Sequence, residues 1–518
     1  MDTFMQSLKN KSIAFTCGIL LGALPTVAQT NTSSGARVQQ VPLSGRQGAN
    51  TVSTQQNSTS GAGSSADTIT TSIQVQGTYQ GSVPDPHAVG SAVSLTLDDA
   101  IRRGLQFNLG SVSASTSLRQ VRAERLAALS QLRPSINASL SMTEQKSNLQ
   151  ALGLTSSALG PNLPFSFPAT VGPFHYYDAR GTVSEDAFDL TAIHNYRSTK
   201  ELQHASQLSA EDARELVVLA VSGEYLRVLA SIALVDSQLA QVQYAQSSYD
   251  QAAAQHKAGT RALIDAQRSL VQLQTEQQRL TSDRADLAKQ KLALARLIGL
   301  PMGVELTLQE KLSPNPTASQ SVDETILRGV AHRSDLQSSE ASLRAAEQAV
   351  KAARAERIPN ANVNAYYGIQ GITPSNGGSG VFSATGSINI PVWQGGRIES
   401  DIQQAQAVVD QRRAEYQDQR GVIELDIRNA FIDASVANEQ VTVSESNRKL
   451  ALDTLRQSQD RFAAGVTDTV EVVQSEETLA AAERDYVNSL YSQNLAKVSL
   501  WRAVGEAEHN ISGLLKGN

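Results

Sequence analysis

The feature that most constrains the fold of this 518-residue chain is an internal duplication. The segments "AAAQHKAGTRALIDAQRSL" and "DRFAAGVTDTVEVVQSEE" align through Gly259 and Gly465, which are 465 − 259 = 206 residues apart. The same separation relates Tyr225 to Phe431. Self-similarity over this length indicates two copies of one structural unit, so the fold must contain that unit twice.

Each copy predicts the same order of elements: helix, strand, loop, strand, long helix, glycine turn and helix. A proline, Pro134 or Pro359, ends the first helix of each copy and leads into the strands. The long helices should measure about 100 Å and the shorter ones about 50–55 Å at 1.5 Å per residue. Two short helices stacked end to end therefore match one long helix, which predicts a shaft rather than a globule. The expected helices are 98–132, 191–257, 262–298, 325–357, 396–463 and 468–504.

Apolar residues in these helices alternate steps of three and four, the pattern of a coiled-coil seam. Polar residues interrupt the seam at places such as Gln277 and, in the second copy, Glu476. An ordinary helical bundle would explain the seams, but neither the match in length nor the strands. The expected seam of the first long helix is Val218, Val221, Tyr225, Val228, Ile232, Val235, Leu239 and Val242, and that of the helix after it includes Leu263, Ala266, Leu273, Leu280, Leu294 and Ile298.

Four segments alternate polar and apolar residues, which predicts half-buried strands with two unlike faces. Each strand, at about ten residues, is long enough to cross a bilayer when tilted. In "NANVNAYYGIQ", Asn360 to Gln370, the expected lipid-facing side is Ala361, Val363, Ala365, Tyr367 and Ile369.

A single chain cannot close a membrane barrel from four strands, because the smallest such barrels need about eight. An open strand edge in lipid costs several kcal/mol for each unsatisfied backbone group. Three chains would supply twelve strands and a matching ring of twelve helices. A soluble sheet covered on one side is the alternative, but the chain offers no element to cover the apolar face.

The N-terminus resembles an export signal, with Lys9 and Lys11 before the apolar run Ile13 to Leu24. No later segment approaches twenty consecutive apolar residues, so any membrane insertion should use strands. Cys17, the only cysteine, lies in the apolar run, so the exported chain would have no thiol chemistry. The expected divisions are a signal peptide at 1–28, a flexible Ser/Thr/Gln-rich arm at 29–92, a first repeat at 93–300, a connector at 301–324, a second repeat at 325–508 and a C-terminal tail at 509–518.

Side chains that catalyse reactions or bind metals do not cluster in this sequence. The seven histidines are scattered, with no pair at i, i+4 and no cysteine partners. No phosphate-binding or nucleophile motif is present. The net charge of −6 argues against a nucleic-acid partner. We therefore expect no enzymatic activity, no cofactor and no metal site.

Three motifs in order resemble those of the TolC-like outer-membrane efflux proteins (outer membrane factors), and the resemblance extends over about residues 95–506. The motifs are "LTLDDAIRRGLQFN" at 95–108, "INIPVWQGGRIESDIQQAQA" at 388–407 and "RFAAGVTDTVEVVQSEETL" at 461–479. The resemblance implies a mainly α fold with a membrane β-barrel. The barrel would be trimeric and 12-stranded, with four strands per chain, and continuous with a long α-helical coiled-coil tunnel.

The same resemblance implies a passive exit duct in the bacterial outer membrane that extends into the periplasm. The duct would serve a tripartite efflux or type I secretion system. The implied partners are two further copies of the chain (a homotrimer), a periplasmic adaptor protein, an inner-membrane pump and outer-membrane lipid. The alternative is a secreted coiled-coil structural or adhesin-like protein.

In that family, acidic side chains just past the tip glycines lie at the closed end of the tunnel. Here Glu471 follows Gly465 by six residues and Asp265 follows Gly259 by six, and Asp468 is a further candidate. Threefold symmetry would turn each into a ring of carboxylates that forms a gate. A solvated helix start, where carboxylates suit the helix dipole, is the alternative. The expected tip turn and adaptor-docking residues are Gly259, Gly465, Arg461 and Phe462.

Overall fold

The computed structural model describes residues 51–60, 67–86, 92–151, 168–317, 321–373 and 378–515. The expected signal peptide and residues 29–50 of the expected arm lie outside these ranges. The chain divides into two units, residues 1–39 and 40–518. Everything below concerns the second unit.

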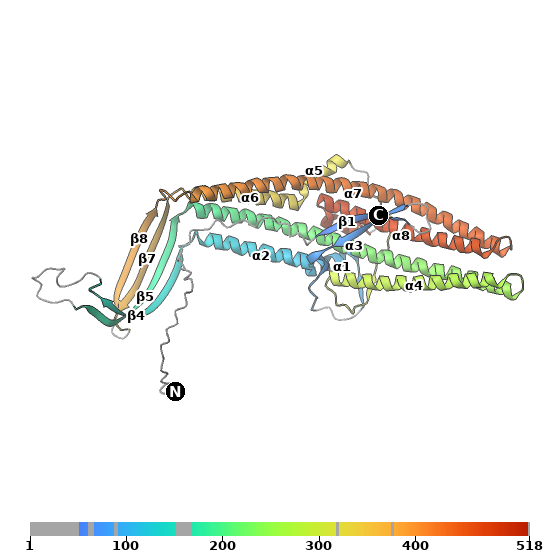
Figure 1. Cartoon of the computed structure of the whole chain (residues 1–518), viewed down its shortest axis with the longest axis horizontal. Coiled ribbons are helices and arrows are strands. Elements are labelled where there is room, and N and C mark those ends of the chain that lie inside the picture. Colours follow the sequence, from blue (N-terminus) through green and yellow to red (C-terminus); the bar gives the residue numbers. More distant parts are fainter. Residues whose placement is uncertain are drawn as a thin grey trace, which may run out of the picture. The chain divides into compact units, whose positions relative to one another are not determined.

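Two helical hairpins dominate this unit (Figure 1). Each consists of a long helix, a turn and a helix of about half the length. The first hairpin is α3 (Leu190–Lys257, 68 residues) and α4 (Leu263–Leu297). The second is α7 (Arg397–Ala463, 67 residues) and α8 (Thr469–Val504). These bounds confirm the four helices expected from the duplication to within one or two residues.

The first helix of each copy is broken, whereas the sequence predicted one continuous helix. Asn108 and Arg333 interrupt the helices with extended backbone at ψ 135° and 117°. These two residues are 333 − 108 = 225 apart, as are Pro134 and Pro359, so the break belongs to the repeated unit. The resulting helices are α1 (Leu97–Phe107), α2 (Leu109–Ser130), α5 (Val322–His332) and α6 (Ser334–Ala355).

Side-chain contacts with distant elements stabilise both breaks. The fully buried Asn108 accepts a hydrogen bond from Gly110 N at 2.8 Å and donates one to Tyr79 O at 2.9 Å. Arg333, 5% exposed, pairs with Asp335 at 2.6 Å and with Asp426 of α7 at 2.9 Å. These partners lie on other elements or across the break, so helix periodicity alone could not reveal the interruption.

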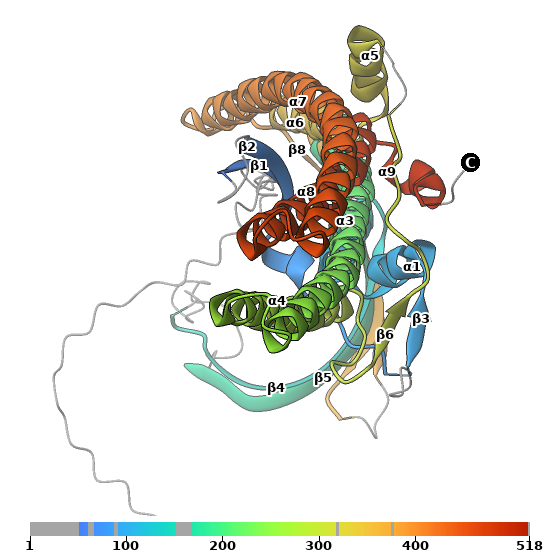
Figure 2. The same cartoon turned by 90° about the vertical axis from the view of Figure 1, so that its right-hand side faces the viewer.

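The helices form one curved layer (Figure 2). Across the layer the order is α2 stacked on α4, then α3, then α6 stacked on α8, then α7. Thus α3 has α2 and α6 as neighbours in one half of the layer and α4 and α8 in the other. The end-to-end stacking of short helices beside a long one confirms the expectation from helix lengths.

The two faces of this layer carry different elements (Figure 2). The convex side carries α1, α5, α9 (Ala507–Asn510) and a small parallel sheet of β3 (Val93–Leu95) and β6 (Leu306–Leu308). The concave side carries an antiparallel hairpin of β1 (Val52–Ser60) and β2 (Asp67–Val75).

A four-stranded antiparallel sheet lies at the end of the helices opposite the glycine turns (Figure 1). Its strand order is β4, β5, β7, β8, so the strand pair of the first copy joins that of the second through β5 and β7. The first pair is longer than the ten residues expected for each strand. The strands are β4 (Ser135–Asn148), β5 (Thr170–Phe188), β7 (Asn360–Gly371) and β8 (Ser379–Asn389).

Three segments expected to lie outside the two repeats, of which only the arm was expected to be flexible, are ordered where the structure describes them. The arm at 29–92 contains β1, β2 and a 3₁₀ turn at Gly77–Gln80, with Ile73 and Tyr79 buried. The connector at 301–324 contributes β6. The tail at 509–518 places Ile511 and Leu514 in the core, at 3% and 2% exposure. Each of these segments is too short or polar to fold alone, and folds here because the helices supply its apolar partners.

The predicted seam of α3 is correct in its first half and wrong in its second. Residues from Val218 to Val235 are mostly buried in the main core. Beyond Val235 the buried positions become Gln238 and Gln241 instead of Leu239 and Val242. In α4 the expected seam residue Leu263 is 52% exposed.

One stretch of α3 is long and apolar enough to cross a membrane by length and composition alone. Within the fold, 72% of that stretch is buried. It packs against α1, α6 and α8 and contributes Val217, Val218 and Tyr225 to the core. The stretch is therefore the central core of the helical layer.

Candidate functional site

One face of the four-stranded sheet is apolar from edge to edge. The strand register places Ile136, Val183, Ala365 and Ala384 in one row. Most neighbouring rows are built in the same way, although the row of Val363 includes Glu185 near the end of the band. All five residues predicted for the apolar face of β7 lie on it. The side chains are exposed: Leu140 80%, Phe382 80%, Tyr367 72%, Ile369 46% and Val363 45%. Such a contiguous exposed apolar surface marks a contact with lipid or another protein.

The opposite face of the sheet is polar. Arg180 pairs with Asp178 through Nε and Oδ1 at 2.6 Å and lies over the ring of Tyr366 at 4.5 Å. Gly368 makes room for this arrangement, because a Cβ there would lie 2.6 Å from Cβ of Arg180. At the end of β4, Ser135 and Ser184 share a hydrogen bond of 2.7 Å.

The polar face is the concave one. On β5 the polar-face side chains from Tyr176 to Ser184 are all buried or half-buried, whereas on the apolar face Tyr177 and Ala179 are half-buried and Gly181 and Val183 are exposed. Side chains crowd together on the inside of a curved sheet and spread apart on the outside. The sheet therefore curves around its polar face and turns its apolar face outward.

Both outer strands of this sheet have an unpaired side. β4 bonds to β5 and β8 bonds to β7, so each has one strand neighbour among the residues that the structure describes. The free edges leave rows of N–H and C=O groups that further strands can pair with. The sheet is thus incomplete in a single chain.

At the other end of the helices, the two predicted glycine turns both have left-handed backbone. Gly259 has φ 74° and Gly465 has φ 75°, a region that suits glycine at a helix C-terminus. The two turns are joined to each other: Arg261 donates to Thr467 O at 2.7 Å and lies over the ring of Phe462 at 5.1 Å. We call this end, comprising residues 255–271 and 461–477, the helical tip. Phe462 is 2% exposed and holds the tip together rather than presenting a free surface.

The three predicted acidic gate residues all lie at the helical tip, and each has a partner within the chain. Asp265 Oδ1 accepts a hydrogen bond from Thr469 at 3.0 Å. Asp468 caps α8: its Oδ1 accepts hydrogen bonds from Val470 N at 3.1 Å and from Glu471 N at 3.3 Å. Glu471 pairs with Arg461 at 3.2 Å. In this chain the carboxylates stabilise the tip, whatever further role they have in an assembly.

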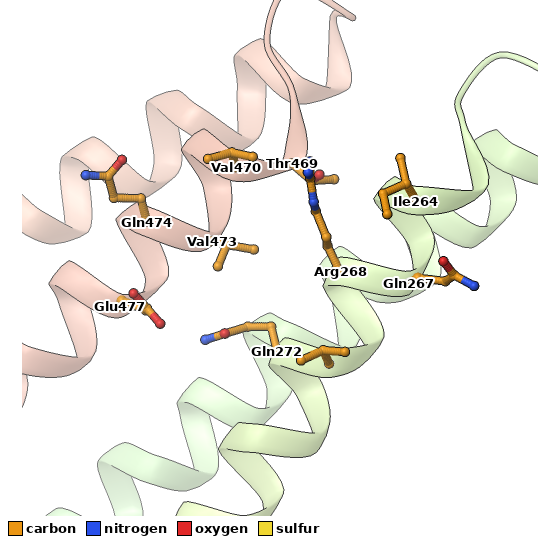
Figure 3. Close-up of a pocket in the computed structure, with 10 residues that line it drawn as sticks. Ile264, Gln267, Arg268, Gln272, Thr469, Val470, Val473, Gln474 and Glu477 are labelled. Carbon is orange, nitrogen blue, oxygen red and sulfur yellow. The ribbon is translucent and has the colours of Figure 1, made fainter.

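A shallow groove of about 610 Å³ runs between α4 and α8 beside the tip (Figure 3). Ile264 and Val470, 51% and 47% exposed, form part of its apolar lining, and Arg268 extends from α4 toward Thr469. Glu477 lies farther along the groove on α8. The groove combines apolar walls with one cation and one carboxylate, a composition that suits contact with another polypeptide.

Two buried carboxylates lie on the same helices, α4 and α8. Glu276 of α4, 3% exposed, accepts hydrogen bonds from Gln238 at 2.6 Å, from Gln272 at 2.9 Å and from Arg279 at 2.7 Å. Its negative charge is therefore surrounded by donors.

Glu476 of α8, 4% exposed, is less well satisfied. Its Oε1 accepts from Ser248 at 2.6 Å, and its Oε2 has no hydrogen-bond partner among the described residues. Burial raises the pKa of Glu476, the Ser248 hydroxyl opposes that shift, and the charge of Glu276 adds to it. The sequence placed Glu476 at a seam position but could not show which side chains would face it.

Among the residues that the structure describes, no group of three or more His, Cys, Asp or Glu side chains is placed to hold a metal ion. The three predicted gate carboxylates, Asp265, Asp468 and Glu471, are paired with Thr, backbone N–H groups and Arg, as given above. Nothing in their arrangement within one chain resembles a closed coordination sphere.

Comparison with known proteins agrees with this architecture. Residues 329–506 match the outer membrane efflux protein family. The toluene efflux pump outer membrane protein TtgF of Pseudomonas putida is 23% identical over 334 residues, which cover 63% of this chain and 67% of TtgF. The cation efflux system protein CusC of Escherichia coli is 23% identical over 337 residues, covering 62% and 71%.

Solved structures share the fold at lower identity. The outer membrane protein VceC of Vibrio cholerae superimposes with a TM-score of 0.65 at 19% identity, over 79% of this chain and 96% of VceC. The CmeC outer membrane channel of Campylobacter jejuni gives 0.67 at 17% identity, over 81% and 89%. With the duplicated helical hairpins and the two-faced sheet, these matches show that the chain has the fold of outer membrane channels and that its residues 329–506 match the outer membrane efflux protein family, the outer membrane factors.

Proposed function

We propose that this chain is the outer-membrane exit duct of a tripartite efflux or type I secretion system. The observation that carries the proposal is the four-stranded sheet at the end of helices about 100 Å long. Its outward face is apolar and exposed, its concave face is polar, and both of its edges lack a strand partner within the described part of the chain. A membrane-spanning wall around an aqueous passage requires this combination.

The open edges support assembly of three chains into one barrel. Twelve strands would remove every free edge, and lipid would cover the apolar band. The helical layers would close into a ring of twelve helices in the same assembly. A polar face such as that around Arg180 and Tyr366 would then line the passage.

Cargo would pass through this duct without chemical change. The named relatives differ in cargo, since TtgF belongs to a toluene efflux pump and CusC to a cation efflux system. A shared fold with different cargo supports a passive conduit whose substrates a separate pump selects. No catalytic role is part of this proposal, and the relatives give no support to a secreted adhesin-like protein.

The helical tip would dock to a periplasmic adaptor and, through it, to an inner-membrane pump. An apolar surface for that contact is supplied by the groove between α4 and α8. Val466 at the turn, which is 70% exposed, adds to this surface. The carboxylates of Asp265 and Glu471, with Asp468 beside them, would form acidic rings at the tip. Contacts such as Arg261 to Thr467 would hold the two helical hairpins of each chain in the closed arrangement.

The proposal is tested with the full-length protein expressed for export and extracted from outer membranes. We expect it to require detergent, to migrate as a trimer that dissociates on heating, and to conduct ions across a planar lipid bilayer. A protein that stays soluble and monomeric without detergent and shows no conductance would contradict the duct and favour the coiled-coil structural alternative.

A further inference from the structure

We propose that the N-terminal hairpin, formed by β1 and β2, lies inside the duct and sets an upper limit on the size of the cargo. The inference rests on the proposed function, because a passage exists only when the helical layers close into a ring. It concerns a segment that the sequence predicted to be a flexible arm. Four observations carry it: the seat of the hairpin, its position on the layer, its width and its composition.

The hairpin is seated on the helices by a specific contact. Ile73 of β2 is 5% exposed and lies against Gly223 of α3, where a Cβ would come within 2.5 Å of its Cδ1. The hydroxyl of Tyr491 on α8 is hydrogen-bonded to the backbone of Ile73. Burial raises the pKa of this Tyr491 hydroxyl. A glycine inside a helix costs about 1 kcal/mol relative to alanine. The close approach of Ile73 gives a physical reason for Gly223.

The seat is present in one copy of the duplication only. The position equivalent to Gly223 is 223 + 206 = 429, which is the exposed residue Asn429. The position equivalent to Tyr491 is 491 − 206 = 285, which is the exposed residue Ala285. The general architecture of the repeat therefore does not require Gly223 or Tyr491 at these positions, whereas contact with the hairpin does.

The hairpin lies on the concave side of the helical layer (Figure 2). Its main contacts are with α3 and α8, which are in the middle of the layer, rather than with the outer helices α7 and α4 that would meet neighbouring chains. The helices α1, α5 and α9 cover the opposite, convex side. The concave side is also the side toward which the sheet turns its polar face. In a closed ring, this side faces the passage.

The width of the passage makes such a hairpin a large obstacle. Twelve helices about 10 Å apart form a ring whose axes lie on a circle about 38 Å across. Subtracting one helix diameter leaves a free width of about 28 Å. Sheets occupy about 10 Å in thickness with their side chains. Three hairpins on the inner wall would therefore leave a central opening of about 8 Å, because each side loses about 10 Å.

The composition of the hairpin indicates selection by size rather than by charge. Its strands read "VSTQQNSTS" and "DTITTSIQV", in which Asp67 is the only charged residue. Hydroxyl and amide groups can form hydrogen bonds with water and cargo, but they carry no net charge. We therefore expect the hairpin to restrict the passage of bulky solutes and to leave the preference between cations and anions almost unchanged.

The test compares the wild-type protein with a variant lacking residues 51–76, both reconstituted in planar bilayers. Both proteins also carry Arg261→Ala, which removes the contact that closes the tip, so that the hairpin becomes the narrowest section. In this background we expect the deletion to raise single-channel conductance about twofold or more, since conductance follows the narrowest section of a pore. We also expect larger poly(ethylene glycol) molecules to enter the deletion variant and reduce its conductance. The ratio of cation to anion permeability should stay the same.

Point variants keep the test decisive if the deletion variant does not assemble. Gly223→Leu and Ile73→Asp should both unseat the hairpin and raise conductance or make it fluctuate between levels. Asn429→Leu places the same side chain at the repeat-equivalent position, away from the hairpin, and should behave as wild type. Conducting deletion or unseated variants with unchanged conductance and unchanged polymer exclusion would overturn the proposal.

The outcome separates this inference from the proposed function. A wild-type protein that forms no trimer and no channel contradicts the duct itself, and the hairpin inference fails with it. A wild-type channel that is indifferent to loss of the hairpin contradicts only the inference.

Discussion

Gly104 of α1 packs so closely on Val221 of α3 that a Cβ at position 104 would lie 2.5 Å from Cγ2 of Val221. The second copy repeats this contact, since a Cβ at Gly329 would lie 2.4 Å from Cδ1 of Ile427. The two glycines are 329 − 104 = 225 residues apart and their partners 427 − 221 = 206. The duplication has thus kept the packing of the convex helices α1 and α5 on the long helices, while the loops between the strands changed in length.

The close contacts predict that a single methyl group will destabilise either copy. Gly104→Ala and Gly329→Ala should each lower stability by about 1–3 kcal/mol, because added volume in a tight interface forces the partner side chain or the backbone to move. The measurement is the unfolding midpoint of the purified protein in detergent. Gly303→Ala is the control, because a Cβ at this exposed glycine would meet nothing within 4 Å, and it should change stability by less than about 0.5 kcal/mol. Equal effects at Gly303 and Gly104 would contradict the packing argument.

The two-faced sheet predicts opposite responses at neighbouring positions of β7. Ala365→Arg places a charge in the apolar row with Ile136 and Val183, and should cost about 2–4 kcal/mol in a bilayer. Asn364→Arg, on the polar face, should be tolerated. The yield of heat-labile oligomer in outer membranes measures the difference.

The register also predicts a smaller effect for a charge placed at Val363, another residue of the apolar face. The register pairs Val363 with Glu185, so its row already contains a carboxylate near the end of the band. Val363→Arg should therefore reduce the oligomer yield less than Ala365→Arg. A loss of oligomer with Asn364→Arg as severe as with Ala365→Arg would show that the two faces are assigned wrongly.

Glu476 predicts a pH dependence of stability. Its pKa is raised mainly by burial, so the folded protein binds more protons than the unfolded chain between the two pKa values. Stability should fall as the pH rises through this interval and stay lower above the folded-state pKa. Glu476→Gln removes the ionisation, so it should raise the unfolding temperature at pH 8 and flatten the profile from mildly acid to neutral pH.

A neighbouring carboxylate provides the control for this experiment. Glu477 is exposed and lines the groove, so Glu477→Gln keeps the change in net charge without relieving burial. Its profile should follow that of the wild type. A profile for Glu476→Gln that keeps the full wild-type slope would mean that Glu476 is not the group responsible.

The acidic tip predicts sensitivity of the channel to divalent cations. The double variant Asp265→Ala with Glu471→Ala should weaken block of single-channel conductance by divalent cations, because rings of carboxylates concentrate such ions near the axis. Thr469→Val removes the hydrogen-bond partner of Asp265 but keeps both charges. It should leave the block intact. Block that is equally weak in Thr469→Val would assign the effect to the geometry of the tip rather than to its charge.

Sequence periodicity could predict the elements whose structure depends on near neighbours. The long helices, the left-handed turns at Gly259 and Gly465 and the two faces of the strands follow from spacing and from the conformational freedom of glycine. The duplication added the length argument that places short helices end to end. For the site, the position of Asp265 and Glu471 at the tip was predictable for the same reason.

Only the tertiary structure decided where distant segments meet. The helix breaks at Asn108 and Arg333 depend on hydrogen bonds and ion pairs to other elements, and the seating of Ile73 depends on a glycine 150 residues later in the chain (223 − 73 = 150). The partners of Glu476 likewise come from two other helices. Local periodicity specifies which side of an element is apolar, but contacts across the fold determine which polar group is satisfied and which segment of low apolar content becomes ordered.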